Sequence, residues 1–199
     1  MGYNLTVPKK SGFAVTDQNT PVNIRDDRGI MFYTTEPIMP VDSFNLPAGK
    51  YMVDSGYFKK LASPVVFKKQ KMPFPETAFA TLPLNFKIAF GMNPNKCTIF
   101  WKQKLILFDD GSGSGVDFRE VPRPYFDFIL NHEYGHSFYG YGTLYTPEQY
   151  EAYCDLFASN RMLDMGYNPS QIINSPKATL SSRQDYRKEF IETTLLNNA

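Results

Sequence analysis

The sequence predicts an α+β protein in which N-terminal strands and loops are followed by helices. Twelve of the 15 prolines lie within residues 1–124, and each proline lacks the backbone donor that a helix interior needs. Residues 86–108 contain short apolar runs with a turn signal between them, as strands do. After residue 122 the prolines become rare and helix-capping residues appear, which predicts helices.

The N-terminal half is expected to consist of loops followed by strands. Residues 1–50 show Pro, Asn and Asp punctuation with little periodicity, which predicts an extended arm or loosely packed loops. Residues 51–199 are then long enough to form a single small domain with its own core. Within residues 86–108 we predict strands at FKIAF, CTIFW and KLILF, with a turn at 93–95. The run DDGSGSGVD at 109–117 predicts a glycine–serine loop.

The C-terminal half is expected to be helical. A first helix should run through YFDFILNHEYGHSFYG, whose last glycine suits the position just after a helix. A second helix should begin after Thr146 as N-cap, with Gln149 completing a capping box, and should end at Gly166. Shorter helices are expected from residue 168 and from residue 182 onward.

Both histidines of the chain lie in the segment NHEYGH at residues 131–136. On a helix, His132 and His136 are one turn plus about 40° apart, so both imidazoles project from the same face. Two neutral imidazoles at this spacing can bind one Zn²⁺ ion. Glu133 lies about 60° from His136 around the helix, where it can reach a water at the metal but is poorly placed as a ligand. The segment therefore predicts a zinc site with a general base, against the alternative of two structural histidines.

The following helix supplies the remaining ligand. A catalytic zinc ion keeps three protein ligands and an open position for water, and no third histidine remains. We prefer Glu151 of the run EAYCD as the third ligand, because Cys154 faces about 60° away from it on a helix. Asp155, one turn further on the same face, can accept a hydrogen bond from the free ring nitrogen of His132 or His136. We therefore expect one Zn²⁺ per chain.

HEYGH followed by EAYCD resembles the gluzincin zinc metallopeptidases, in which an HExxH helix precedes a helix carrying ExxxD. The resemblance extends over residues 86–166 and rests on these two motifs. It implies a zincin-like domain and an endopeptidase that hydrolyses peptide bonds with a zinc-activated water. It also implies roles for five side chains. His132, His136 and Glu151 would be the zinc ligands. Glu133 would be the general base, and Asp155 would be a carboxylate that supports a ligand from outside.

The same resemblance bears on substrate binding. It implies a peptide bound in extended form beside a strand that precedes the HExxH helix, and CTIFW or KLILF would fill that place. Thermolysin-like members stabilise the oxyanion with a downstream histidine, which this chain lacks. We therefore expect a tyrosine or arginine donor, with Tyr141, Tyr145 and Arg183 as the candidates. The exopeptidase motif GAMEN is absent, so aminopeptidase activity is not expected.

An uneven distribution of charge suggests an alternative function. Residues 1–108 carry 14 Lys and Arg against 7 Asp and Glu, whereas residues 109–199 carry 7 against 13. The basic half could dock onto a larger protein assembly. The chain would then be a zincin-like structural or interaction protein, for example a phage particle or morphogenesis component, in which zinc pins two helices together. Glu133 favours the enzyme, because a purely structural metal site has no use for a base.

Other partners and locations receive less support. Nucleic-acid binding would use a basic cluster interleaved with aromatic residues: Lys59, Lys60, Lys68, Lys69, Lys71, Tyr57, Phe58 and Phe67. No recognition motif accompanies this cluster, so we do not expect a nucleic-acid partner. No apolar run is long enough to cross a bilayer, and the first residues lack the pattern of a signal peptide. We therefore expect a cytoplasmic protein, or a virion-associated one, that binds a peptide or protein substrate.

Overall fold

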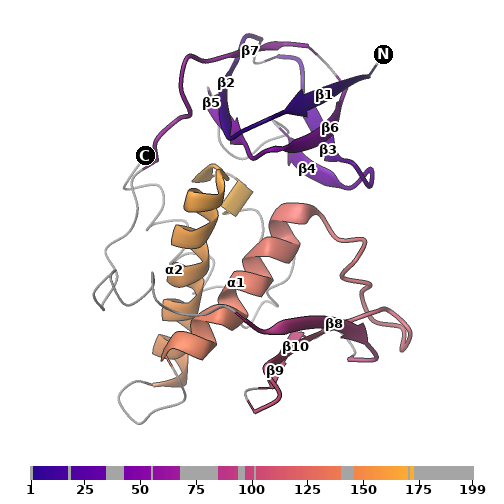
Figure 1. Ribbon diagram of the computed structural model, residues 1–199, viewed down its shortest axis with the longest axis vertical. Helices are drawn as coiled ribbons and strands as arrows, with labels where there is room; N and C mark the ends of the chain where they lie inside the picture. Colours follow the sequence, from indigo (N-terminus) through magenta and orange to yellow (C-terminus); the bar gives the residue numbers. More distant parts are fainter. Residues whose placement is uncertain are drawn as a thin grey trace.

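The computed structural model describes nine stretches of the chain: residues 2–17, 19–34, 43–54, 56–67, 85–93, 97–100, 102–139, 146–169 and 171–172. Over these residues the protein has the predicted α+β class, with ten strands followed by two helices. Seven strands lie at one end of the helix pair, and the other three pack beside the first helix (Figure 1).

The first seven strands form two antiparallel sheets. Their bounds are β1 (Tyr3–Val7), β2 (Ser11–Val15), β3 (Asn23–Asp26), β4 (Met31–Thr34), β5 (Ser43–Leu46), β6 (Gly49–Val53) and β7 (Phe58–Lys60). The strand orders are β1-β6-β3-β4 and β5-β2-β7. Successive side chains of a strand point to opposite faces, so in β6 Tyr51 and Val53 are buried while Lys50 and Met52 are exposed. Each sheet therefore presents one apolar face to the interior.

The prediction of an extended arm or loose loops for residues 1–50 is wrong for the described part of that segment. Phe13 and Tyr33 stack on Phe44, with ring centroids 5.5 and 4.3 Å from it, in a shared core. Phe58 packs edge-on against Phe13 and Phe44, so its ring faces this core instead of forming a stacking platform for bases. Lys68, Lys69 and Lys71 lie outside the described residues, and the proposed boundary at residue 50 stays a prediction.

The three predicted strands of residues 86–108 are confirmed as β8 (Lys87–Gly91), β9 (Cys97–Phe100) and β10 (Leu105–Asp109). β10 lies between the other two, parallel to β8 and antiparallel to β9. Its buried residues Ile106 and Phe108 pack toward the helices. Among the described strands, β8 and β9 are therefore the edges of this sheet.

Both long helices lie where the sequence predicts them, as α1 (Arg123–Tyr139) and α2 (Pro147–Met165). The capping box of α2 is present: the Thr146 hydroxyl accepts from the Gln149 amide, and the Gln149 side chain accepts from the Thr146 amide. Gly166 ends α2 with φ of 105°, a conformation that favours glycine. The local chemistry of these caps is sufficient to set both ends of α2.

The helix pair lies between two hydrophobic cores. One core joins Phe128 of α1 and Met162 of α2 to the N-terminal strands, and the other joins Tyr134 and Leu156 to β8–β10. The chain is helical again at residues 169 and 171–172, as expected, whereas the helix predicted from residue 182 lies outside the described residues. Neither described helix is both long and apolar enough to cross a membrane.

Candidate metal centre

The two histidines project from one face of α1 toward α2, as their spacing predicts. Both are buried, and their ring centroids lie 4.7 Å apart. Glu151, in the first turns of α2, has its carboxylate opposite them. Its Oε2 lies 3.2 Å from Nε2 of His132, and its Oε1 lies 3.4 Å from Nε2 of His136. Two nitrogen atoms and a carboxylate thus converge from two helices.

This convergence makes a group that could hold a metal ion. The ligand atoms of His132, His136 and Glu151 all lie within 4.8 Å of one another. Across the part of the chain that the structure describes, no other set of three His, Cys, Asp or Glu side chains is arranged in this way. The Glu151 side chain is 34% exposed, whereas the two imidazoles are buried. The group is therefore open to solvent on the side of Glu151.

Asp155 orients His132. The sequence left open which imidazole this carboxylate would contact, and the structure pairs Asp155 Oδ1 with Nδ1 of His132 at 2.8 Å. Asp155 is fully buried. Because a carboxylate only accepts, Nδ1 of His132 carries the proton and donates it, which leaves the Nε2 lone pair directed toward Glu151.

Cys154 contacts the other histidine, which sequence reasoning did not foresee. Its Sγ lies 3.3 Å from Nδ1 of His136, on the far side of the ring from Glu151, so Cys154 is not one of the converging ligands. When Nε2 of His136 binds a metal, Nδ1 carries the proton and donates it to this sulfur. The two imidazoles therefore have unlike supports, a carboxylate for His132 and a thiol for His136.

A glycine lets the helices approach closely enough for these contacts. A Cβ atom on Gly135 would lie 2.9 Å from Cα of Cys154 and 3.3 Å from its Sγ. Any side chain at this position would push α2 away from α1. The glycine in HEYGH is the sequence feature that could have indicated this close approach of the two helices, because a glycine inside a helix often has a packing reason.

Glu133 lies beside His132 and near β9. Glu133 is 9% exposed, and its charge is felt at Cys97 of that strand: burial raises the pKa of the Cys97 thiol, and the negative charge of Glu133 raises it further. The predicted general base is therefore a buried carboxylate on α1, next in sequence to His132. The candidate oxyanion donors Tyr141, Tyr145 and Arg183 all lie outside the described residues.

No family model, curated protein or solved structure shows significant similarity to this chain. The two short motifs, and the geometry of the side chains that they bring together, are therefore the features of this chain that indicate a function.

Proposed function

We propose that this protein is a zinc-dependent peptidase of the gluzincin type. The observation that carries the proposal is the convergence of His132, His136 and Glu151 within 4.8 Å. Two neutral imidazoles and one carboxylate, with a side open to solvent, are the donors that catalytic zinc uses in His₂Glu enzymes. The contact between Asp155 and Nδ1 of His132 supports the same assignment, because metal-binding histidines usually donate their second ring hydrogen to an acceptor.

Each residue then has a defined part in hydrolysis. A bound zinc ion would supply a Lewis acid and would lower the pKa of water to about 7. Glu133 takes the proton of the attacking water and passes it to the leaving amine. Its place next to His132 on α1 supports this role, since a base beside a metal-binding histidine can reach a water at the metal.

The peptide is proposed to bind along β9. The sequence left two strands open for this role, CTIFW and KLILF. The second corresponds to β10, which is already paired on both sides by β8 and β9. β9 has a partner on one side only among the described strands, so it can accept an extended peptide by backbone hydrogen bonding.

Three variants, compared with wild type by zinc content and by hydrolysis of casein, test this function. Wild type, Glu133→Gln and Glu148→Gln should each contain about one zinc per chain by mass spectrometry, and Glu151→Ala should lose it. Glu148 is the matched control, because it lies exposed in the first turn of the same helix as Glu151. Hydrolysis of casein should survive Glu148→Gln and fall by about 10²–10⁴-fold in Glu133→Gln.

The possible outcomes separate the alternatives. Full activity in Glu133→Gln would exclude this residue as the base. Zinc binding without hydrolysis of casein by wild type would favour the structural or interaction protein, such as a phage particle component, over the enzyme. Failure of wild type to bind zinc after reconstitution would reject the metal site itself.

A further inference from the structure

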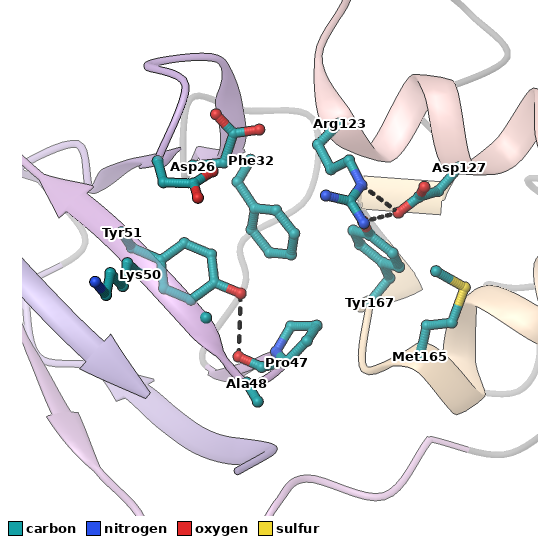
Figure 2. Close-up of a pocket in the computed structure, with 12 residues that line it drawn as sticks. Asp26, Phe32, Pro47, Ala48, Lys50, Tyr51, Arg123, Asp127, Met165 and Tyr167 are labelled. Carbon is teal, nitrogen blue, oxygen red and sulfur yellow. Dashed lines mark hydrogen bonds and ion pairs between the residues drawn. The ribbon is translucent and has the colours of Figure 1, made fainter. Parts of the chain in front are cut away.

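A cavity of about 360 Å³ lies at the other end of α1, between the N-terminal sheet and the helix pair. Figure 2 shows side chains from both parts pointing into it: Phe32 and Tyr51 from the sheet, Arg123 from α1, and Met165 and Tyr167 from the end of α2. Arg123 precedes His132 by nine residues, roughly 14 Å along the helix. The cavity is therefore separate from the candidate metal centre.

One wall of the cavity is an arginine held in place by a buried carboxylate. Nε of Arg123 donates to Oδ2 of Asp127 at 2.9 Å, and the same oxygen accepts from the Tyr167 hydroxyl. The Asp127 side chain is only 4% exposed, whereas that of Arg123 is 43% exposed. Burial alone would lower the pKa of Arg123, but Asp127, Tyr167 and Asp26 together raise it. The guanidinium is thus fixed on its Nε side and stays charged.

The opposite edge of this guanidinium faces the cavity and has no hydrogen-bond partner among the described residues. Neither Nη atom of Arg123 makes a hydrogen bond to any described residue, and in Figure 2 the group points toward the middle of the cavity. The nearby carboxylate of Asp26 is already hydrogen-bonded. Its Oδ1 accepts from the backbone N–H groups of Arg28 and Ile30, and its Oδ2 accepts from the guanidinium of Arg28. Among the described residues of the lining, Oδ1 of Asp127 and the carboxylate oxygens of Asp27 also make no hydrogen bond. The Nη edge of Arg123 therefore adds donors to a lining that offers carboxylate acceptors as well.

Three aromatic side chains, Phe32, Tyr51 and Tyr167, form another part of the cavity lining. Phe32 stacks on Tyr167 and meets Tyr51 edge-on, with both pairs of ring centroids 5.2 Å apart, and all three side chains are buried. Burial raises the pKa of Tyr51 to about 12, so its hydroxyl stays neutral and donates to the carbonyl of Pro47. The parts of these rings that line the cavity add apolar surface beside the guanidinium.

The charges that line the cavity disfavour a doubly negative ligand. Three carboxylates line it, Asp26, Asp27 and Asp127, against two cations, Lys50 and Arg123. A single negative charge can pair with the free Nη edge, but a second one would face the surrounding carboxylates. A planar carboxylate matches the two Nη atoms in a bidentate arrangement.

From this arrangement we propose that the cavity binds a small monocarboxylate with a flat aromatic or apolar body. The carboxylate pairs with the Nη edge of Arg123, and the body lies against Phe32, Tyr51 and Tyr167. Asp127 is a positioning residue that holds the guanidinium from behind.

The test compares three probes that share an aromatic ring: phenylacetate, phenethylamine and phenyl phosphate. Metal-free full-length protein is used, so that no probe can ligate an ion at His132 and His136. Binding is followed by the NMR signal of the Met165 methyl group, which lines the cavity. We expect phenylacetate to bind best, with a Kd on the order of 1 mM for a ligand of this size.

Variants locate the binding. Arg123→Lys keeps the charge but loses the planar fork, and it should raise the Kd of phenylacetate by about fivefold or more. The double variant Arg123→Gln/Asp127→Asn removes both charges together, so no buried charge is left without a partner, and it should raise the Kd by about tenfold or more. Lys59→Gln, on the exposed side of β7, removes one positive charge elsewhere and should change nothing.

Four results would overturn the proposal. The first is that phenethylamine binds more tightly than phenylacetate, and the second is that phenyl phosphate binds as tightly as phenylacetate or more tightly. The third is that no probe shifts the Met165 signal at concentrations well above the expected Kd. The fourth is that the Kd of phenylacetate is unchanged in both arginine variants. None of them depends on zinc or on peptide hydrolysis, because the protein is tested without metal. A failure of this proposal is therefore distinguishable from a failure of the peptidase assignment.

Discussion

The two ends of α1 differ in the kind of group that they leave available. At the C-terminal end, His132 and His136 direct their Nε2 atoms toward the carboxylate of Glu151, so that electron-pair donors converge. At the N-terminal end, Asp127 engages only one side of Arg123 and leaves the Nη hydrogens facing a cavity. Convergent lone pairs suit a cation, whereas unmatched N–H groups suit an anion. One helix can therefore carry two sites of opposite preference, because its first turns line the cavity while its two histidines face Glu151 of α2.

The largest expected effect comes from variants at either end of α1, each of which should impair binding at its own end alone. His136→Ala removes one converging nitrogen and should weaken zinc binding by more than about 100-fold, beyond the loss typical of outer contacts. Phenylacetate binding at the Arg123 end should stay unchanged. Arg123→Lys should give the reverse pattern. Zinc affinity is measured by competition with a chromophoric chelator, and a joint loss of both affinities in either variant would show that the ends are not independent.

The second largest effect is expected from a change at the contact between α1 and α2, close to His132, His136 and Glu151. Gly135→Ala places a Cβ atom 2.9 Å from Cα of Cys154, so α2 must shift. We expect a loss of about 1–2 kcal/mol in the free energy of unfolding, because overpacking outweighs the roughly 1 kcal/mol by which alanine favours a helix. Zinc affinity should fall too, since Glu151 moves with α2.

Urea denaturation measures this loss of stability. Gly56→Ala is the matched control, because a Cβ atom there meets nothing within 4 Å. Equal stability of wild type and Gly135→Ala would show that the helices can adjust at no cost.

His132 is supported by a carboxylate and His136 by a thiol, so removing each support should reduce zinc affinity by a different amount. Asp155→Asn weakens a buried acceptor of His132 and should reduce zinc affinity by about 10-fold or more. Cys154→Ala removes a weaker sulfur acceptor from His136, and we expect a loss of only a few-fold. The same chelator competition gives both values. A larger loss in Cys154→Ala than in Asp155→Asn would make the thiol the dominant support.

The smallest effect is a pH dependence at the Arg123 end. Burial raises the pKa of Asp127 above its ordinary value of 3.8, although Arg123 and Tyr167 oppose the rise. The folded state therefore holds this proton more tightly than the unfolded state does. The resulting stabilisation is complete below pH 3.8 and is lost as the pH rises through the raised pKa.

Asp127→Asn lacks this titration. The difference in unfolding free energy between wild type and Asp127→Asn should therefore become less favourable to wild type as the pH rises through that window. Urea denaturation of both proteins at a series of pH values measures this difference. If the difference became more favourable to wild type as the pH rises, the pKa of Asp127 would be lowered in the folded state and not raised.

The metal end was predictable from sequence because its determinants are local. The i, i+4 spacing of the histidines fixes their common face, and Thr146, Gln149 and Gly166 fix the ends of α2 through contacts within a few residues. The pairing of Asp155 with His132 instead of His136 was not predictable, because it depends on how far one helix slides along the other. Cys154 was considered only as a rival ligand, since its approach to His136 depends on the packing at Gly135.

The N-terminal sheets and the cavity were missed for the opposite reason. β1 pairs with β6, with Tyr3 opposite Val53, so neither strand is stabilised by its sequence neighbours. Short strands separated by Pro and Asn then look like loops, and only the assembled core shows that Phe13 and Phe44 are buried. Arg123 and Tyr51 gave no signal, because no sequence pattern links a helix start to a strand 72 residues earlier.

The same difference in sequence separation has a consequence for folding. Asp155 reaches His132 across 23 residues, whereas the contact of Gln171 with the Phe32 carbonyl, which ties the end of the helices to the sheet, spans 139 residues. Closing a short loop costs less entropy than closing a long one, and local contacts form faster. The α1–α2 hairpin can therefore bring His132, His136 and Glu151 together while the N-terminal strands are still finding their partners. A growing or refolding chain would then have a group that could hold a metal ion before it has the cavity beside Arg123.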